Sequence, residues 1–394
     1  MAKILYITPF FNFPPKDGAS CRSVYLFEKL CEKHDVVLLT YPNKGLESYS
    51  GQINGKIRIH EMPFKRKSNK IHSFFQRLIS TELPGFATHD INTISENIDN
   101  LILEYGQFDI HYFATQLMGQ IVLKKKYSGV NIIDLYDIYV EHRKGKFSDV
   151  PIWKPFHWLL RLEALRVKNY ERKIFQMFDH ILVTCDEEAT IVDKLVYKAS
   201  IFKIPNGVNY PKKIKRRSEI GNILMVGNFE HSPNMEGILW FYNKVWKMVK
   251  KRYEDSKLIL VGKMPESLKK TLSNDEDIKL EGLVPELNPY YELASCIIIP
   301  IFHLSGIKIK LLEAMAYGIP IVSTQTGGMG FEDIPTIKFA DTPESFAYAI
   351  QQLLTQDVVS DDELEKSRKI IYNSYTWDKI GDELNNIIHS IGGE

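Results

Sequence analysis

The feature that most constrains this chain is an alternation of strand-like and helix-like segments that runs through it twice. In the first half, short apolar runs predict strands at residues 3–8, 35–40, 110–114, 131–135 and 180–184. The pattern then restarts, with predicted strands at 223–226, 257–261, 296–300 and 319–323. Strands separated by helices form parallel sheets with helices on both faces. The sequence therefore predicts an α/β protein of two tandem, doubly wound, Rossmann-like domains facing a cleft.

The two halves join at a run of turn residues, 205–208, followed by a proline-led basic run at 211–217. Such composition is typical of a linker. It predicts an N-terminal domain over residues 1–205 and a C-terminal domain over residues 206–370. We expect the remaining residues, 371–394, to form an amphipathic helix that packs back on the first domain.

Composition excludes several classes of function. The 394 residues carry a formal net charge of +1, whereas a protein that binds nucleic acid over its whole surface is usually clearly basic. The four cysteines are far apart and none has C-x-x-C spacing, so we expect neither a zinc ribbon nor a disulfide framework. The P-loop pattern and a dinucleotide-binding G-x-G-x-x-G after the first strand are both missing from the sequence. With neither a signal peptide nor a membrane-spanning apolar run, we expect a cytoplasmic protein.

The segment at 305–320 has the most specific pattern. It follows a predicted buried strand, and Gly306 lies just ahead of a predicted helix at 309–317. The amide groups at the start of a helix bind phosphate, and Lys308 and Lys310 add positive charge. Glu313, on the same helix, could accept hydrogen bonds from two sugar hydroxyls. The same spacing also fits an ordinary amphipathic helix with solvated lysines.

The same residues carry a family resemblance. The run "GIKIKLLEAMAYGIPIVST" strongly resembles the donor-binding segment of GT-B glycosyltransferases, especially family 4, the group 1 glycosyl transferases. Further similar segments cover most of residues 201–324: "IPNGVN", "ILMVGNFEHSPN", "KLILVGKMPE" and "LEGLVPELNPYYELASCIIIPI". The first domain is similar through "PPKDGASCRSVYLFEKL" and "IIDLYDIYVEHRKGKF". The resemblance implies the GT-B fold and a hexosyltransferase-like enzyme that moves a sugar from a nucleoside-diphosphate sugar to an acceptor hydroxyl. It also implies that this enzyme needs no metal and no cofactor.

The resemblance also implies roles for single residues. Glu313 would hold the donor ribose, and Gly18 would let the first domain approach the diphosphate or the acceptor. The diphosphate and base contacts would come from Gly227, Asn228, Val284, Gly306, Ile307, Lys310 and, more weakly, Lys308. Ser305 stands where retaining members often carry the first glutamate of a Glu-x7-Glu motif that ends at Glu313. A contact from this position to the transferred sugar would therefore come from a hydroxyl.

Proton transfer requires a base near the acceptor hydroxyl. Asp134 and Asp137 lie at the end of a predicted strand, in the segment where relatives keep an Asp or His near the reacting centre. Asp137 is the leading candidate for this base, and Asp134 and His142 are the others. Asp137 could instead be a helix N-cap, a position that aspartate favours.

Two segments of the first half combine basic and apolar residues. Residues 65–80 begin with a basic run and continue with an apolar stripe at helical spacing: Ile71, Phe74, Phe75, Leu78 and Ile79. Residues 153–161 have similar chemistry. Such helices bind anionic membrane surfaces, although both stripes could pack on the first sheet instead. The first segment predicts peripheral contact with the inner face of the cell membrane, which would suit a lipid-linked acceptor.

The leading interpretation is a glycosyltransferase that builds a surface polysaccharide, a lipopolysaccharide or a glycolipid, with a glycan or lipid-linked acceptor. Two alternatives stay open at this point. A sugar-nucleotide 2-epimerase would use the same donor pocket without an acceptor, and a non-catalytic GT-B subunit would bind a partner enzyme.

Overall fold

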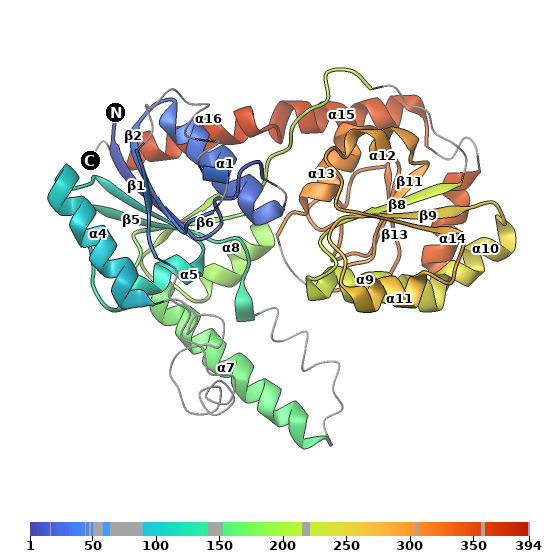
Figure 1. Cartoon of the computed structure of the whole chain (residues 1–394), viewed down its shortest axis with the longest axis horizontal. Helices are drawn as coiled ribbons and strands as arrows, with labels where there is room; N and C mark the ends of the chain where they lie inside the picture. Colours follow the sequence, from blue (N-terminus) through green and yellow to red (C-terminus); the bar gives the residue numbers. More distant parts are fainter. Residues whose placement is uncertain are drawn as a thin grey trace. The chain divides into compact units, whose positions relative to one another are not determined.

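The computed structural model describes residues 1–15, 17–43, 45–46, 49, 58–63, 90–140, 153–214, 221–303, 306–355 and 359–392. The chain forms two compact units (Figure 1). The first comprises Met1–Pro205 together with Ile380–Glu394, and the second comprises Asn206–Lys379.

The first unit is built on a sheet of seven parallel strands in the order β3-β2-β1-β4-β5-β6-β7. Its strands are β1 (Lys3–Thr8), β2 (Asp35–Thr40), β3 (Arg58–Glu61), β4 (Ile110–Ala114), β5 (Val130–Asp134), β6 (His180–Val183) and β7 (Ser200–Lys203). The strand order reverses between β1 and β4. Ligands of open α/β sheets bind beyond the carboxyl ends of the strands at such a reversal, so the loops after β1, β4 and β5 are where a ligand is expected.

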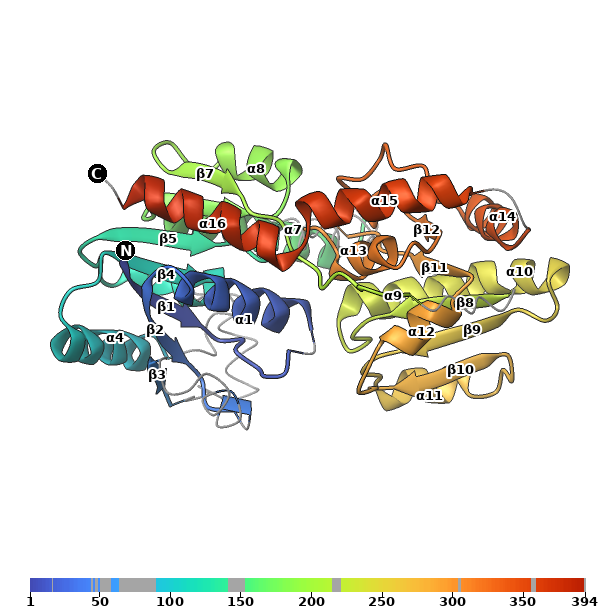
Figure 2. The same cartoon turned by 90° about the horizontal axis from the view of Figure 1, so that it is seen from above.

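Helices cover both faces of this sheet (Figures 1 and 2). One face carries α1 (Gly18–Cys31) and α16 (Trp377–Ile391). The other carries α4 (Ile91–Tyr105), α5 (Gln116–Gly119), α7 (Pro155–Phe175) and α8 (Asp186–Asp193). Helix α1 begins at Gly18 because Asp17 caps it. The Asp17 carboxylate accepts a hydrogen bond from the Ser20 amide at 2.9 Å, as part of a capping box.

The C-terminal helix α16 completes the first unit. Ile380, Leu384 and Ile388 on one side of it are fully buried. The Asn385 side-chain amide donates to the carbonyl of Lys29 on α1 at 3.0 Å. The preceding helix, α15 (Asp361–Ser374), belongs to the second unit, so the chain returns to the first unit at Ile380 rather than at residue 371.

The second unit repeats the architecture with six parallel strands in the order β10-β9-β8-β11-β12-β13. Its strands are β8 (Asn222–Val226), β9 (Lys257–Val261), β10 (Ile278–Gly282), β11 (Cys296–Ile299), β12 (Ile321–Ser323) and β13 (Ile337–Phe339). One face carries α9 (Ser232–Trp240), a π-helical turn (Phe241–Trp246), α10 (Lys247–Arg252), α11 (Glu266–Leu272) and α14 (Pro343–Leu354), and the other carries α12 (Asn288–Leu293), α13 (Ile309–Ala316) and α15. The reversal of strand order lies between β8 and β11, which confirms the prediction of two tandem Rossmann-like domains.

Candidate functional site

In the second unit, the start of α13 has features that suit an anion. The N-cap residue is Lys308, which makes no side-chain cap, and the first turn holds no acidic residue. The first amides of a helix have no acceptor inside the helix and carry the positive end of its dipole. Because α13 follows β11, next to the strand-order reversal, these amides face the region where a ligand of this sheet is expected.

Lys310 lies one residue into α13, is half-buried, and donates its Nζ to Oδ1 of Asn234 at 2.6 Å. Burial and the nearby charge of Lys308 lower the pKa of Lys310 to about 7, and Glu313 opposes this shift. In the free protein, the negative charge near the Lys310 ammonium group therefore does not balance its positive charge and the cost of its burial. A diphosphate at this position would supply that charge.

Glu313 follows Lys310 by almost one helical turn and is also half-buried. Burial raises the pKa of Glu313 to about 7, against a hydrogen bond from Tyr291 and the charge of Lys310, which both lower it. The buried Tyr291 hydroxyl donates to Oε2 of Glu313 at 2.6 Å, and the Tyr291 ring stacks on Tyr317. Tyr291 thereby fixes the orientation of the carboxylate.

Asn234, which the sequence analysis did not single out, joins this site. The Asn234 side chain joins Lys310 to the loop after β8, because its Nδ2 donates to the carbonyl of Asn228 at 2.8 Å. A Cβ on Gly227 would lie 3.1 Å from Asn234 and 3.2 Å from Lys310 Nζ, so a side chain there would crowd the lysine. The structure thus brings Gly227, Asn228 and Lys310 together.

Hydrogen bonds from two side chains to backbone carbonyls hold the loop ahead of α13. Nδ2 of Asn206 donates to the carbonyl of Ile307 at 2.8 Å, and Lys308 Nζ donates to the carbonyl of Gly306 at 2.9 Å. In a trans peptide the carbonyl and the following amide point in opposite directions. The Asn206 bond therefore fixes the direction of the Lys308 amide. Val284 lies half-buried just beyond the carboxyl end of β10, and Ser305 lies outside the described residues.

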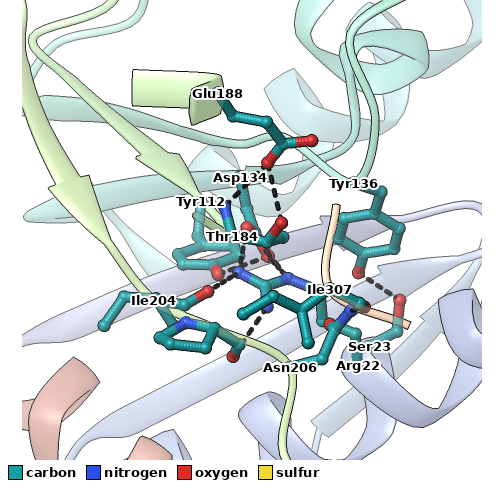
Figure 3. A network of polar contacts seen from close by, with 11 residues as sticks. Arg22, Ser23, Tyr112, Asp134, Tyr136, Thr184, Glu188, Ile204, Asn206 and Ile307 are labelled. Atoms are coloured by element: carbon teal, nitrogen blue, oxygen red, sulfur yellow. Dashed lines mark hydrogen bonds and ion pairs between the residues drawn. The ribbon is translucent and has the colours of Figure 1, made fainter. Parts of the chain in front are cut away.

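In the first unit, Asp134 belongs to a buried network rather than to an open site (Figure 3). The Arg22 guanidinium binds both carboxylate oxygens of Asp134, with its closest contact at 2.6 Å, and the Tyr112 hydroxyl donates to the same carboxylate at 2.9 Å. Arg22 also donates to the carbonyls of Ile204 and Pro205 at 2.9 and 3.1 Å. A fully buried carboxylate held in this way has a structural role, so its position does not support Asp134 as the acceptor base.

Asp137 lies three residues beyond β5 and is half-buried. The Gln116 side-chain amide donates to its carbonyl at 2.9 Å. A helical turn begins at Tyr139, and the buried Glu171 carboxylate accepts the amides of Tyr139 and Val140 at 2.7 and 3.1 Å. Glu171 therefore accepts the first two amides of this turn.

The loop after β4, beside this segment, contains strained backbone. Thr115 is buried and has a φ of 79°, a conformation that a β-branched residue rarely adopts and that costs about 1–3 kcal/mol. Within the described part of the chain, Oγ1 of Thr115 and Oε1 of Gln116 are buried without a hydrogen-bond partner. Strained residues cluster at ligand sites, and this one lies at the strand-order reversal of the first sheet.

The remaining predicted residues are placed as follows. Gly18 is exposed and is the first residue of α1 rather than part of a loop. The Asp17 carboxylate takes the position at that helix start which a phosphate would need. His142 and the predicted membrane segment 65–80 lie outside the described residues.

Two searches of the described residues gave no positive result. No group of three or more His, Cys, Asp and Glu side chains is arranged to hold a metal ion within the ranges given above. In the same ranges, no helix combines the length and apolar character needed to cross a bilayer.

Known proteins resemble this chain in sequence and in fold. Residues 221–356 match the family model of the glycosyl transferases group 1. An uncharacterized 44.6 kDa protein in the cps region of Klebsiella pneumoniae is 25% identical over 341 residues, which cover 84% of each chain.

Solved structures share the whole fold. Sucrose-phosphate synthase from Thermosynechococcus elongatus has a TM-score of 0.74 at 17% identity over 99% of both chains. HepE of Anabaena, in complex with UDP and glucose, has a TM-score of 0.66 at 12% identity over 99% of this chain and all of the other. Both sheets and their helices thus form the GT-B fold, and the predicted fold class is confirmed.

Proposed function

We propose that this chain, a glycosyltransferase of the group 1 family, binds a nucleoside-diphosphate sugar on its second domain and transfers the sugar to a hydroxyl held by its first domain. The observation that carries the proposal is the pairing of Lys310 and Glu313 on one turn of α13, directly after the start of that helix. A cation and helix amides suit a diphosphate, and a carboxylate one turn further along suits the two ribose hydroxyls. The bound UDP of the HepE structure supports a nucleotide-sugar donor.

On the donor side, the diphosphate gains negative charge as its bond to the anomeric carbon breaks. Lys310 and the amides at the start of α13 would stabilise that charge, because they are fixed in place before the reaction. Asn206 and Asn234 act as positioning residues: the first directs the Lys308 amide and the second directs the Lys310 ammonium group. The Gly227 backbone leaves the space that the Lys310 side chain occupies.

On the acceptor side, Asp137 is the proposed general base. It would take the proton of the acceptor hydroxyl while the acceptor oxygen bonds to the anomeric carbon and the nucleoside diphosphate leaves. Its loop is held by Gln116 on one side and Glu171 on the other. As product, we propose a bacterial surface glycan, with support from the Klebsiella relative in a cps region.

The test of this function is donor binding together with nucleotide release. UDP-glucose and GDP-mannose are titrated calorimetrically, and the ligand that binds is then incubated with acceptor extracts. A transferase releases free nucleoside diphosphate, whereas a 2-epimerase changes the sugar nucleotide without releasing it. Lys310→Ala should weaken donor binding about tenfold or more, since charge-assisted hydrogen bonds contribute about 1.5–3 kcal/mol. Lys251→Ala, which removes an exposed lysine on α10, should leave affinity unchanged, and equal affinities for the two variants would contradict the assignment of Lys310.

Donor affinity should also depend on pH from both sides of neutrality. Lys310, with a pKa of about 7, loses its charge as the pH rises, and Glu313, with a pKa of about 7, loses its charge as the pH falls. Affinity should therefore be highest near pH 7. This titration requires a sugar nucleotide as the probe, because the charge of its esterified diphosphate stays constant near pH 7. The terminal phosphate of a free nucleoside diphosphate has a pKa of about 6 and would add its own pH dependence.

Two conservative variants separate the limbs of this profile. Glu313→Gln cannot be protonated, so it should abolish the loss of affinity at low pH. Lys310→Arg stays charged throughout, so it should abolish the loss at high pH. A wild-type affinity that stays flat from pH 6 to pH 8 would contradict both assignments.

A further inference from the structure

Helix α7 exposes large apolar side chains along one face. Trp158, Leu162 and Leu165 are 50%, 59% and 52% exposed, and Trp153, just before the helix, is 82% exposed. The three helical residues are spaced i, i+4 and i+7, so they form one stripe. The opposite side of the helix packs into the first unit through Val167, Ile174 and Phe175. The exposed stripe is thus a second apolar face beside the one that the core uses.

The charges on this face have one sign. Every charged residue that is exposed between 153 and 175 is a cation: Lys154, Arg161, Lys168, Arg172 and Lys173. Of the acids of the helix, Glu163 is half-buried and Glu171 is buried against the Tyr139 and Val140 amides. The Arg161 guanidinium lies 5.4 Å from the centre of the Trp158 ring. We call the set formed by Trp158, Arg161, Leu162, Leu165 and Lys168 the outer face of α7.

We propose that the outer face of α7 is a docking surface for anionic membranes. Apolar patches on soluble domains usually mark interaction sites. Tryptophan and leucine flanked by arginine and lysine match the interfacial region of a bilayer, where the rings lie among the headgroups and the cations meet lipid phosphates. This surface differs from the block 153–161 that the sequence indicates. It is one helical face that extends to Lys168 and excludes His157, which is buried.

The test is sedimentation of the full chain with vesicles, which needs neither donor nor acceptor and is independent of the proposed function. The wild type should sediment with phosphatidylglycerol–phosphatidylcholine vesicles and not with pure phosphatidylcholine. Trp158→Ser with Leu162→Ser should weaken this binding at least tenfold. The matched control is Leu103→Ser with Tyr348→Ser, which removes apolar residues on α4 and α14 that are 83% and 57% exposed and should bind as the wild type does.

A charge variant gives a second readout that leaves the apolar stripe intact. Arg161→Glu with Lys168→Glu should also release the protein from anionic vesicles, with an unchanged thermal midpoint because both side chains are exposed. Unchanged sedimentation of the two α7 variants would overturn the proposal, as would a wild type that binds neither kind of vesicle. A self-association in solution that Trp158→Ser with Leu162→Ser abolishes, without vesicle binding, would assign the face to a second copy of the chain and would also overturn it.

Discussion

Replacing Asp137 with asparagine is expected to lower turnover by about 10²–10⁴, the usual effect of losing a general base, while leaving donor affinity within about twofold. The reason is positional. Asp137 lies in the first domain beyond β5, whereas the residues proposed to hold the donor, Lys310 and Glu313, belong to the second. Nucleotide release measures turnover, and calorimetry with the sugar nucleotide measures affinity.

The asparagine keeps the size of the side chain and the Gln116 bond to the Asp137 carbonyl, so the loop should stay in place. Glu171→Gln is the matched control, because it weakens the acceptor of the Tyr139 and Val140 amides without touching the proposed base. If Asp137→Asn keeps full turnover, Asp137 is not the base, and His142 becomes the next candidate. If it loses donor binding instead, Asp137 belongs to the donor site.

Replacing Arg22 with methionine should destabilise the first domain by about 3–5 kcal/mol, the usual result of leaving one charge of a buried ion pair without its partner. Arg22 and Asp134 are both fully buried, and among the described residues the Tyr112 hydroxyl is the one side-chain donor that would still contact the carboxylate. The carbonyls of Ile204 and Pro205 would lose a donor as well. Urea unfolding of the full chain, followed through the transition of the first domain, measures the loss.

Two comparisons isolate the cause. Lys125→Met breaks the half-exposed pair between Lys125 and Asp99, and we expect a loss below about 1 kcal/mol, as for other surface pairs. Arg22→Met combined with Asp134→Asn removes the unpaired charge and should recover part of the stability. An Arg22→Met protein that unfolds at the wild-type urea concentration would show that the buried pair contributes no net stability.

The strands that the sequence predicts are those at the centres of the two sheets. Parallel strands buried on both faces are continuous apolar runs, as in β1 and β11. The four strands that the sequence analysis did not predict, β3, β7, β10 and β13, are the two edges of each sheet. Edge strands are short and partly solvated, so polar residues interrupt their apolar pattern, as in "RIHE" and "SIFK".

The candidate site divides in a similar way. Lys310 and Glu313 lie within one contiguous segment whose pattern is specific. Their partners are distant: Asn234 is 76 residues from Lys310, and Asn206 is 101 residues from Ile307. Asp134 illustrates the same limit, because its sequence position at a strand end suggests a base, whereas its role follows from Arg22, 112 residues away. Such pairs are set by topology, and a single sequence does not show them.

The return of the chain at Ile380 has a consequence for how the protein is made. Domains usually fold in order of synthesis, the N-terminal one first. Here the first domain lacks Ile380, Leu384 and Ile388, which are fully buried, until the whole second domain has been translated. The first domain is therefore completed after the second, and the surface of α1 around Lys29 that α16 covers stays open while the second domain is made. A premature stop codon just before Ile380 would damage the first domain, although the sheet of that domain is encoded before residue 206.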